Sequence, residues 1–137
     1  MKVRLATDND LDKVIKLSRL KEQETKQNTI VLDKPMLTLD IVAVAVDNGA
    51  IVGYGIYFLD SYIDKSNNKT FKKYVKRKEF FALPQYKQKG VYRQLMSYLK
   101  NYAKKIKIKE LTEDEALEQS FRVFIRDNIK TQKEKCK

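Results

Sequence analysis

The spacing of apolar and polar residues predicts a strand and a helix at the start of the chain. Residues 2–6 alternate charged and apolar side chains, which favours a short strand. Apolar residues then recur at helical spacing and predict a helix over 8–24. Thr7 and Asp10, three positions apart, form a capping-box pattern before this helix. Residues 25–40 lack a clear period, and we expect a loop with a short helix there.

The middle of the chain predicts three strands. Residues 41–46 are rich in β-branched side chains, and 50–59 are their expected partner. The Asn-Gly pair at 48–49 lies between them and tolerates the positive φ angles of a tight hairpin. Residues 60–70 are polar and predict a loop. The aromatic and basic residues 71–83 predict a further strand.

The last third of the chain predicts a helix, a strand and a second helix. Residues 90–105 carry an apolar stripe at helical spacing, and 106–111 alternate as a strand does. Thr112 and Glu115 form a second capping-box pattern before a final amphipathic helix. The order β-α-β-β-β-α-β-α predicts one α/β (α+β) domain over 1–137, with a central mixed sheet flanked by helices. The two strands joined by helix 90–105 are expected to be parallel.

The composition excludes several classes of protein. The 137 residues suit one domain with one core, and we expect neither a membrane-spanning helix nor a signal peptide. Cys136 is the one cysteine, so no internal disulfide is expected, and a reducing, cytoplasmic location is the natural interpretation. The absence of histidine removes the commonest general base and the commonest metal ligand, and we expect no metal site.

The net charge of +11 leaves the kind of partner open. A basic surface attracts nucleic acid, anionic lipid, coenzyme phosphates or an acidic protein, but lysines are equally often only solvated. Residues from about 129 onward form a polar, basic tail. Aromatic residues among the lysines could stack on bases, yet at strand spacing they more often belong to a core. These aromatic residues are Tyr54, Tyr57, Phe58, Tyr62, Phe71, Tyr74, Phe80 and Phe81.

The strand-to-helix turn within 82–96 has the pattern of an anion site. The strand stops at Pro84, a short polar loop follows, and Gly90 precedes an amphipathic helix. Such a turn aims free backbone N–H groups and the positive end of a helix dipole at one point, and glycine allows close approach of a phosphate. Lys87 and Lys89 add positive charge. The alternative is an ordinary connection whose lysines face water.

This turn resembles that of the GNAT N-acetyltransferases, which carry Arg/Gln-x-x-Gly-x-Gly/Ala between a strand and a helix, often after Val-x-Pro. Here residues 87–92 read Lys-Gln-Lys-Gly-Val-Tyr, and 82–84 read Ala-Leu-Pro. Residues 4–11 are similar to the opening strand and helix cap of the family, and 47–53 are similar to its hairpin before the central strand. The resemblance covers about residues 2–112. In its general pattern the chain is also similar to some phage-encoded members of the family.

The resemblance implies a binding mode for acetyl-CoA as co-substrate. Backbone groups of Phe81, Ala82 and Leu83 would pair with the pantetheine arm. The pyrophosphate would be held by the charge of Lys87 and by the N–H groups of Gln88, Lys89, Gly90, Val91 and Tyr92. An unidentified amine would then attack the thioester directly, so that the protein contributes positioning and a donor near the carbonyl oxygen.

The family usually protonates the leaving thiolate with a tyrosine on its last helix. Ser120 or Phe121 occupies the comparable place in this chain. Phenylalanine has no proton to donate, and a serine hydroxyl is a poor acid. Tyr92, which replaces a small residue of the family motif, is a candidate substitute, and Ser120 stays a weak candidate.

Glu79 is a candidate general base, since some members of the family keep a glutamate on this strand. Its odd separation from Ala82 points it to the opposite face of the strand. The alternative is that Glu79 is a surface charge that pairs with Lys78 or Arg77. This alternative is favoured because most carboxylates in proteins lie on the surface. Water can also relay a proton, so activity does not require a carboxylate here.

The last hairpin of the family is not expected in this chain. Residues 126–137 are polar and basic, whereas the family adds two strands after its last helix. The sheet would then expose an edge that a protein partner could cover. Three functions are therefore alternatives: an acyl-CoA-dependent N-acyltransferase, an inactive structural or adaptor subunit of an assembly such as a phage virion, and a basic nucleic-acid-associated module.

Overall fold

The computed structural model describes residues 1–25, 32–64, 70–112 and 114–118. The chain divides into two compact units. The first unit consists of Met1–Phe58 and Arg77–Lys107, and the second consists of Leu59–Lys76 and Ile108–Lys137. That residues 1–137 form a single domain therefore stays a prediction.

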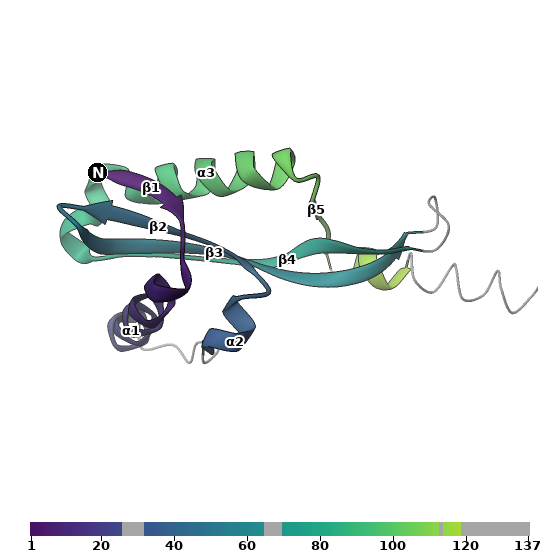
Figure 1. Cartoon of the computed structure of the whole chain (residues 1–137), viewed down its shortest axis with the longest axis horizontal. Helices are drawn as coiled ribbons and strands as arrows, with labels where there is room; N and C mark the ends of the chain where they lie inside the picture. Colours follow the sequence, from purple (N-terminus) through teal and green to yellow (C-terminus); the bar gives the residue numbers. More distant parts are fainter. Residues whose placement is uncertain (26–31, 65–69, 113, 119–137) are drawn as a thin grey trace, which may run out of the picture. The chain divides into compact units, whose positions relative to one another are not determined.

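Five strands form one sheet (Figure 1). They are β1 (Lys2–Leu5), β2 (Ile41–Asp47), β3 (Ala50–Asp64), β4 (Thr70–Ala82) and β5 (Lys109–Glu110). Their order in the sheet is the order of the sequence. β2 pairs antiparallel with β1 and with β3, and β5 pairs parallel with β4. The predicted mixed sheet and the predicted parallel pairing are both confirmed.

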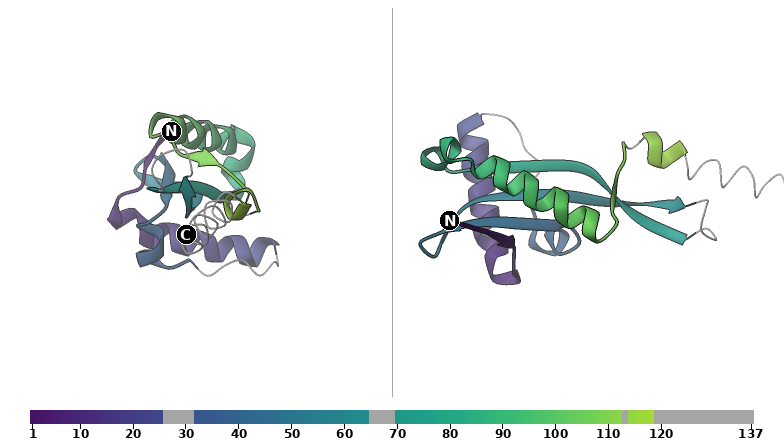
Figure 2. Two further views of the ribbon diagram at one scale, coloured as in Figure 1. Left: turned by 90° about the vertical axis from the view of Figure 1, so that its right-hand side faces the viewer. Right: turned by 90° about the horizontal axis from the view of Figure 1, so that it is seen from above.

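Helices cover both faces of the sheet in the first unit (Figures 1 and 2). They are α1 (Asp8–Thr25), α2 (Lys34–Leu37), the 3-10 helix η1 (Pro84–Lys89) and α3 (Val91–Lys105). α1 and α2 lie on one face, and α3 lies on the other. Residues 114–118 of the second unit are also helical. No helix within the described ranges is long and apolar enough to cross a membrane.

The core on the α1 face follows from the periods of its elements. Side chains two apart on β2 and β3 point to the same face and meet the apolar stripe of α1. The buried members are Leu11, Val14, Leu17, Leu32, Leu37, Val42, Val44, Tyr54, Ile56 and Phe81. Tyr57, Tyr62 and Tyr74 are buried as well, so the interpretation of the aromatic residues as core is confirmed for these positions. The side chain of Phe71 lies outside the described part of the chain.

On the opposite face, α3 packs directly against the backbone of β3. A methyl group added at Gly55 would lie 2.8 Å from Leu99 Cδ1, and one added at Gly53 would lie 2.8 Å from the Phe81 carbonyl oxygen. Both distances are too short for a real side chain, and a methyl group at Gly53 would also lie only 3.2 Å from Val91 Cγ1 of α3, so glycine at both positions lets the helix lie this close to β3. The buried residues of α3 facing the sheet are Val91, Leu95, Leu99 and Ala103.

The β2–β3 hairpin is as tight as predicted. Asp47 pairs with Ala50, which leaves Asn48 and Gly49 as a two-residue loop. Both loop residues have positive φ angles, 50° for Asn48 and 78° for Gly49. Asn-Gly is the sequence that such a turn favours, because both residues tolerate the left-handed region.

Two boundaries differ from the sequence-based prediction. Residues 60–64, expected in a loop, continue β3, because Tyr62 is buried against Tyr74 with ring centroids 6.0 Å apart. Residues 106–108, expected in a strand, are not part of one. Lys107 adopts a left-handed conformation with φ 60° after α3 ends, so the extended backbone begins only at β5.

The second unit has a small core of its own. Tyr62, Tyr74 and Ala116 are buried together, and Leu111 packs against them. The predicted cap at Thr112 forms, since the Glu115 N–H donates to Thr112 Oγ1 at 3.1 Å. Phe121 and the basic tail, including Cys136, lie outside the described residues, as does any strand that could follow the last helix.

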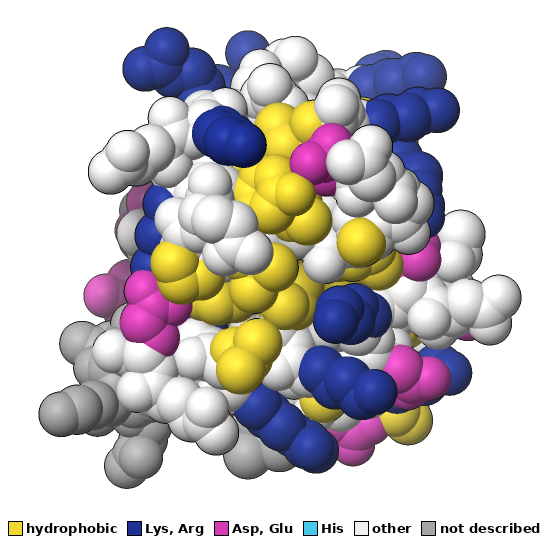
Figure 3. All heavy atoms as spheres, turned by 90° about the vertical axis from the view of Figure 1, so that its left-hand side faces the viewer, with side chains coloured by type: hydrophobic (Ala, Val, Ile, Leu, Met, Phe, Trp, Pro, Cys, Tyr) yellow, Lys and Arg dark blue, Asp and Glu magenta, His cyan; other side chains and the backbone are white. Residues whose placement is uncertain are grey.

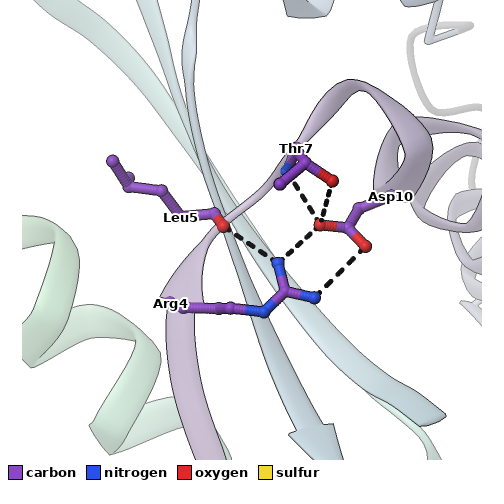
Figure 4. A network of polar contacts seen from close by, with 4 residues as sticks. All are labelled: Arg4, Leu5, Thr7 and Asp10. Carbon is purple, nitrogen blue, oxygen red and sulfur yellow. Dashed lines mark hydrogen bonds and ion pairs between the residues drawn. The ribbon is translucent and has the colours of Figure 1, made fainter. Parts of the chain in front are cut away.

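The start of α1 is held by a polar cluster around the Asp10 carboxylate (Figure 4). Asp10 accepts hydrogen bonds from the Thr7 N–H at 2.7 Å and the Thr7 hydroxyl at 2.9 Å. The Arg4 guanidinium contacts both carboxylate oxygens, at 2.6 and 3.3 Å. The bond from Arg4 is the main cause that lowers the pKa of Asp10 to about 2. One carboxylate therefore joins β1 to α1.

We expect the Asp10 cluster to stabilise the protein at neutral pH and to lose this effect in acid. A lowered pKa means that the stabilisation is complete above the ordinary value of 3.8 and disappears as the pH falls through about 2. Because Asp10 lies near the surface, the contribution is about 1–2 kcal/mol. Urea unfolding of Asp10→Asn should show this loss at pH 7 and a much smaller one at pH 2.5.

The control for this experiment is Asp12→Asn, since Asp12 is on the same helix but its side chain is 71% exposed and its ion pair with Lys34 is long, at 3.7 Å. The free energy of unfolding of this variant should lie within about 0.5 kcal/mol of the wild-type value at both pH values. An equal loss for Asp10→Asn at pH 7 and pH 2.5 would contradict the assignment.

Candidate functional site

The turn from β4 into α3 has the geometry of an anion site. After η1, Gly90 adopts a left-handed conformation with φ 76° and ψ 16°, and α3 begins at the next residue. No side chain caps α3, and its first turn contains no acidic residue. The first hydrogen bond into the helix runs from the Gln94 N–H to the Gly90 carbonyl at 3.1 Å. The preceding N–H groups of α3 therefore have no acceptor inside the helix.

The space beside Gly90, at this helix end, is open. A methyl group built on Gly90 would meet no atom within 4 Å. Figure 3 views the end of the first unit that carries the β2–β3 hairpin and the start of α3, and shows an apolar band with lysine and arginine side chains on both sides. A phosphate group could reach the free N–H groups from this side, where the positive end of the helix dipole also acts.

Long-range contacts hold η1 in place. The Tyr86 hydroxyl donates to Asp47 Oδ2 at 2.8 Å, which ties the turn to the β2–β3 hairpin. Lys87 forms an ion pair with Glu24 near the end of α1. The bond to Asp47 raises the pKa of Tyr86, and the bond to Glu24 raises the pKa of Lys87. The charge of Lys87, expected to face a pyrophosphate, is thus compensated by Glu24 in this structure.

The edge of β4 before the turn offers backbone groups to a ligand. The Leu83 N–H donates to the Val52 carbonyl at 2.9 Å, and the Phe81 carbonyl also lies on the β3 side, next to Gly53. Because backbone groups alternate along a strand, those of Phe80 and Ala82 face away from β3. Of the residues expected to pair with pantetheine, Ala82 is therefore on the outer edge, whereas the Leu83 N–H already has an acceptor.

β5 does not extend along this edge. It pairs with Tyr74 and Val75, which belong to the second unit. Among the described residues of the first unit, no strand pairs with the outer edge of β4 beyond Arg77. The backbone groups of Phe80 and Ala82 are consequently not committed to a neighbouring strand.

Glu79 is buried, and the interpretation of this residue as a surface charge is wrong. Its side chain is 8% exposed, and Oε2 accepts a hydrogen bond from the Tyr54 hydroxyl at 2.8 Å. Lys21 Nζ lies 3.5 Å from Oε1. Glu79 shares the α1 face of β4 with Phe81, two residues on, which explains its burial. A buried carboxylate is tolerated there because a hydroxyl and an ammonium group accompany it.

The residues expected to pair with Glu79 contact aromatic rings. The Arg77 guanidinium lies 4.4 Å from the centre of the Phe58 ring, and Lys78 Nζ lies 5.1 Å from that of Tyr57. Arg77 and Lys78 therefore pack against rings of β3 through cation–π contacts.

The Tyr54 hydroxyl, which donates to Glu79, has a raised pKa. Burial is the main cause that raises the pKa of Tyr54, followed by the charge of Glu79 and, to a smaller extent, by Tyr92. Tyr92 is half-buried in the first turn of α3 and also influences the pKa of Lys87, after the stronger effect of Glu24. Of the sequence-predicted candidates, Glu79 lies on β4 and Tyr92 lies in the first turn of α3. The third, Ser120, lies outside the described residues.

Sequence reasoning missed Tyr54, Tyr86 and Lys21. Their partners are far along the chain, 25 residues away for Tyr54 and 39 for Tyr86, so no local pattern indicates them. Within the described residues, no group of three or more aspartates, glutamates or cysteines is placed to hold a metal ion.

Comparison with known proteins identifies the fold. No family model and no curated protein sequence matches the chain. Solved structures do match. An acetyltransferase from Vibrio fischeri has a TM-score of 0.54 at 22% identity, over 80% of this chain and 91% of that one. The ribosomal-protein-alanine N-acetyltransferase from Brucella melitensis has a TM-score of 0.58 at 16% identity, over 81% and 77%.

A third match is a structure that contains CoA. This aminoglycoside N-acetyltransferase has a TM-score of 0.51 at 13% identity, over 86% of this chain and 84% of that one. Identities this low establish a shared fold rather than a shared substrate. The chain thus shares the fold of these acetyltransferases, which is the fold that the resemblance to the GNAT family implied.

Proposed function

We propose that the protein is an acyl-CoA-dependent N-acyltransferase that transfers an acetyl group to an amine. The observation that carries the proposal is the uncapped start of α3, which follows left-handed Gly90 and opens onto free space. Free N–H groups and a helix dipole suit the pyrophosphate of coenzyme A. The likeness in fold to acetyltransferases, one of them in complex with CoA, supports the same ligand.

The binding mode uses two sets of backbone groups. The pyrophosphate is held by the N–H groups at the start of α3, those of Val91 and Tyr92 first, with Lys89 nearby. The pantetheine arm lies along the outer edge of β4 and pairs with Phe80 and Ala82, as an added strand would. Ala82 was also expected to pair with pantetheine from the sequence. Phe80 replaces Phe81 and Leu83, the other two residues of that prediction.

The reaction is a direct transfer. The amine nitrogen attacks the thioester carbonyl carbon, a C–N bond forms, the C–S bond breaks, and coenzyme A leaves as a thiolate. The nitrogen loses a proton, and the thiolate gains one. Glu79 is the candidate acceptor for the first proton, through water, and Tyr92 is the candidate donor for the second. The protein lowers the barrier chiefly by holding the reactants together.

An inactive GNAT-fold subunit of a larger assembly is the alternative function. Tyr92 favours it, because a large side chain stands in the first turn of α3 where the acetyltransferase motif has a small residue. In that case the fold would be retained without the ligand, and the open edge of β4 would serve a protein partner.

Calorimetric titration with acetyl-CoA tests the proposal. We expect binding with a Kd of about 1–100 μM, which corresponds to about −8 to −5.5 kcal/mol. The acetyl thioester of N-acetylcysteamine, which lacks the pyrophosphate, should give no detectable heat at the same concentrations. A folded protein that fails to bind acetyl-CoA even at millimolar concentration would exclude the acyltransferase and favour the inactive subunit.

A further inference from the structure

The positive charge of the protein is concentrated in one stretch of sequence. Residues 80–109 contain no aspartate and no glutamate. The basic residues in this stretch are Lys87, Lys89, Arg93, Lys100, Lys104, Lys105, Lys107 and Lys109. α1, on the other face of the sheet, is different, because its five acidic residues outnumber its four basic residues. Four of the eight basic residues of this stretch lie on α3, namely Arg93, Lys100, Lys104 and Lys105.

On α3, the helix that covers one face of the sheet (Figure 2, right), three of these residues fall on the side opposite the buried stripe. Arg93, Lys100 and Lys104 are exposed, and helical spacing places them opposite the buried stripe of the helix. Ser97 and Asn101 lie between them and are exposed as well. At 1.5 Å per residue, the row from Arg93 to Lys104 is about 16 Å long.

The row is not explained by the stability of the helix. Lys100 and Lys104 are like charges four residues apart, which destabilises a helix slightly. Arg93 stands in the first turn, where the helix dipole repels a positive charge. Within the described residues, none of the three forms an ion pair, whereas Lys21, Lys34 and Lys87 do. A row of uncompensated cations is what an anionic partner requires.

The chemistry of the row favours nucleic acid over a lipid surface. A helix that lies on a membrane inserts large apolar side chains at the centre of its outer face. Here the centre is occupied by Ser97, Asn101 and the basic residues. Serine and asparagine side chains, together with arginine and lysine, are common donors to phosphodiester oxygens. A length of about 16 Å matches about five successive nucleotides at 3.4 Å each.

We propose that the outer face of α3, formed by Arg93, Ser97, Lys100, Asn101 and Lys104, binds the sugar–phosphate backbone of a nucleic acid without sequence preference. The two lysines of this site are separate from the proposed coenzyme site, because Lys100 and Lys104 lie about three and four turns along the helix from Gly90, whereas Arg93 stands in the first turn. It does not depend on acyl transfer and could serve either an enzyme or an inactive subunit.

Fluorescence anisotropy with two labelled probes tests this proposal: a 20-base-pair duplex DNA and a 20-nucleotide RNA, both of mixed sequence. The test variant is the double substitution Lys100→Glu and Lys104→Glu. The control is Lys13→Glu and Lys16→Glu on α1, two exposed lysines whose replacement changes the net charge equally. We expect the α3 variant to bind at least one probe about 10-fold or more weakly, and the control less than about 3-fold.

Salt dependence and folding complete the test. The slope of log K against log salt for duplex DNA should fall by about 2 in the α3 variant, one phosphate for each lysine. Circular dichroism melting should show that both variants remain folded. Equal losses in the two variants would reduce the effect to net charge and overturn the proposal. So would unchanged binding in the α3 variant, or stronger binding to phosphatidylserine vesicles than to either probe.

Discussion

Replacing Gly90 with glutamate should abolish binding of acetyl-CoA and leave the protein folded. The new side chain would start from open space at the residue that precedes α3, one residue from the first N–H group of the helix. Its carboxylate would occupy the place of the pyrophosphate and repel it. We expect calorimetry to show a loss of at least about 100-fold in affinity, or about 2.7 kcal/mol.

Two controls separate the charge from the backbone strain of this substitution. Gly49→Glu adds the same side chain at a glycine with a nearly identical φ of 78° and equally open surroundings, but in the hairpin. It should cost a similar stability, about 1–2 kcal/mol, and retain binding. Gly90→Asn, which tolerates the left-handed conformation and carries no charge, should weaken binding far less than glutamate. If Gly90→Glu bound as well as the wild type, the turn would not be the pyrophosphate site.

Removing the Glu79 carboxylate should destabilise the protein more than any other change described for the site. In Glu79→Ala, the buried Tyr54 hydroxyl would lose its acceptor, and Lys21 would lose a nearby negative charge. Stranding a buried polar group costs about 1–3 kcal/mol, and breaking a buried ion pair costs more. Because Lys21 is partly exposed, we expect a total of about 2–4 kcal/mol by urea unfolding.

The variant Glu79→Gln is the matched control, since its amide oxygen can still accept the Tyr54 hydrogen bond. It should cost about half as much as the alanine variant. A double-mutant cycle with Tyr54→Phe should give a coupling energy of about 1 kcal/mol or more. Additive effects within about 0.3 kcal/mol would show that the hydrogen bond contributes nothing to stability.

Glu79→Gln also tests the proposed proton transfer. If Glu79 accepts the proton of the amine, the variant should bind acetyl-CoA normally but acetylate an amine slowly at neutral pH, with the rate recovering as the pH rises and more of the amine is already neutral. A purely structural role would lower stability and leave this pH profile unchanged.

The elements that local patterns determine were predictable. Asn48-Gly49 indicated a two-residue hairpin because few other pairs accept two positive φ angles. Pro84 and Gly90 likewise marked the end of β4 and the start of α3, since proline cannot continue the strand ladder and glycine suits the left-handed residue before the helix. The candidate coenzyme turn could therefore be located from its own residues.

What determines the surroundings of that turn could not be predicted locally. The environment of Glu79 depends on Tyr54, which belongs to β3, and on Lys21, which belongs to α1. A glutamate among lysines and arginines reads as a surface charge until the register of β3 and β4 is known. The extension of β3 to Asp64 has the same cause, because it depends on the contact between Tyr62 and Tyr74.

The glycines beneath α3 have a consequence for any screen of variants. With Gly53 and Gly55 in β3, the helix rests on bare backbone, and the height of its first N–H groups above the sheet is set by that contact. A larger residue at either position would act as a spacer that lifts or tilts the helix. Such a variant would bind the ligand poorly although its new side chain does not contact the ligand. Positions that affect binding would then include residues in the middle of the sheet.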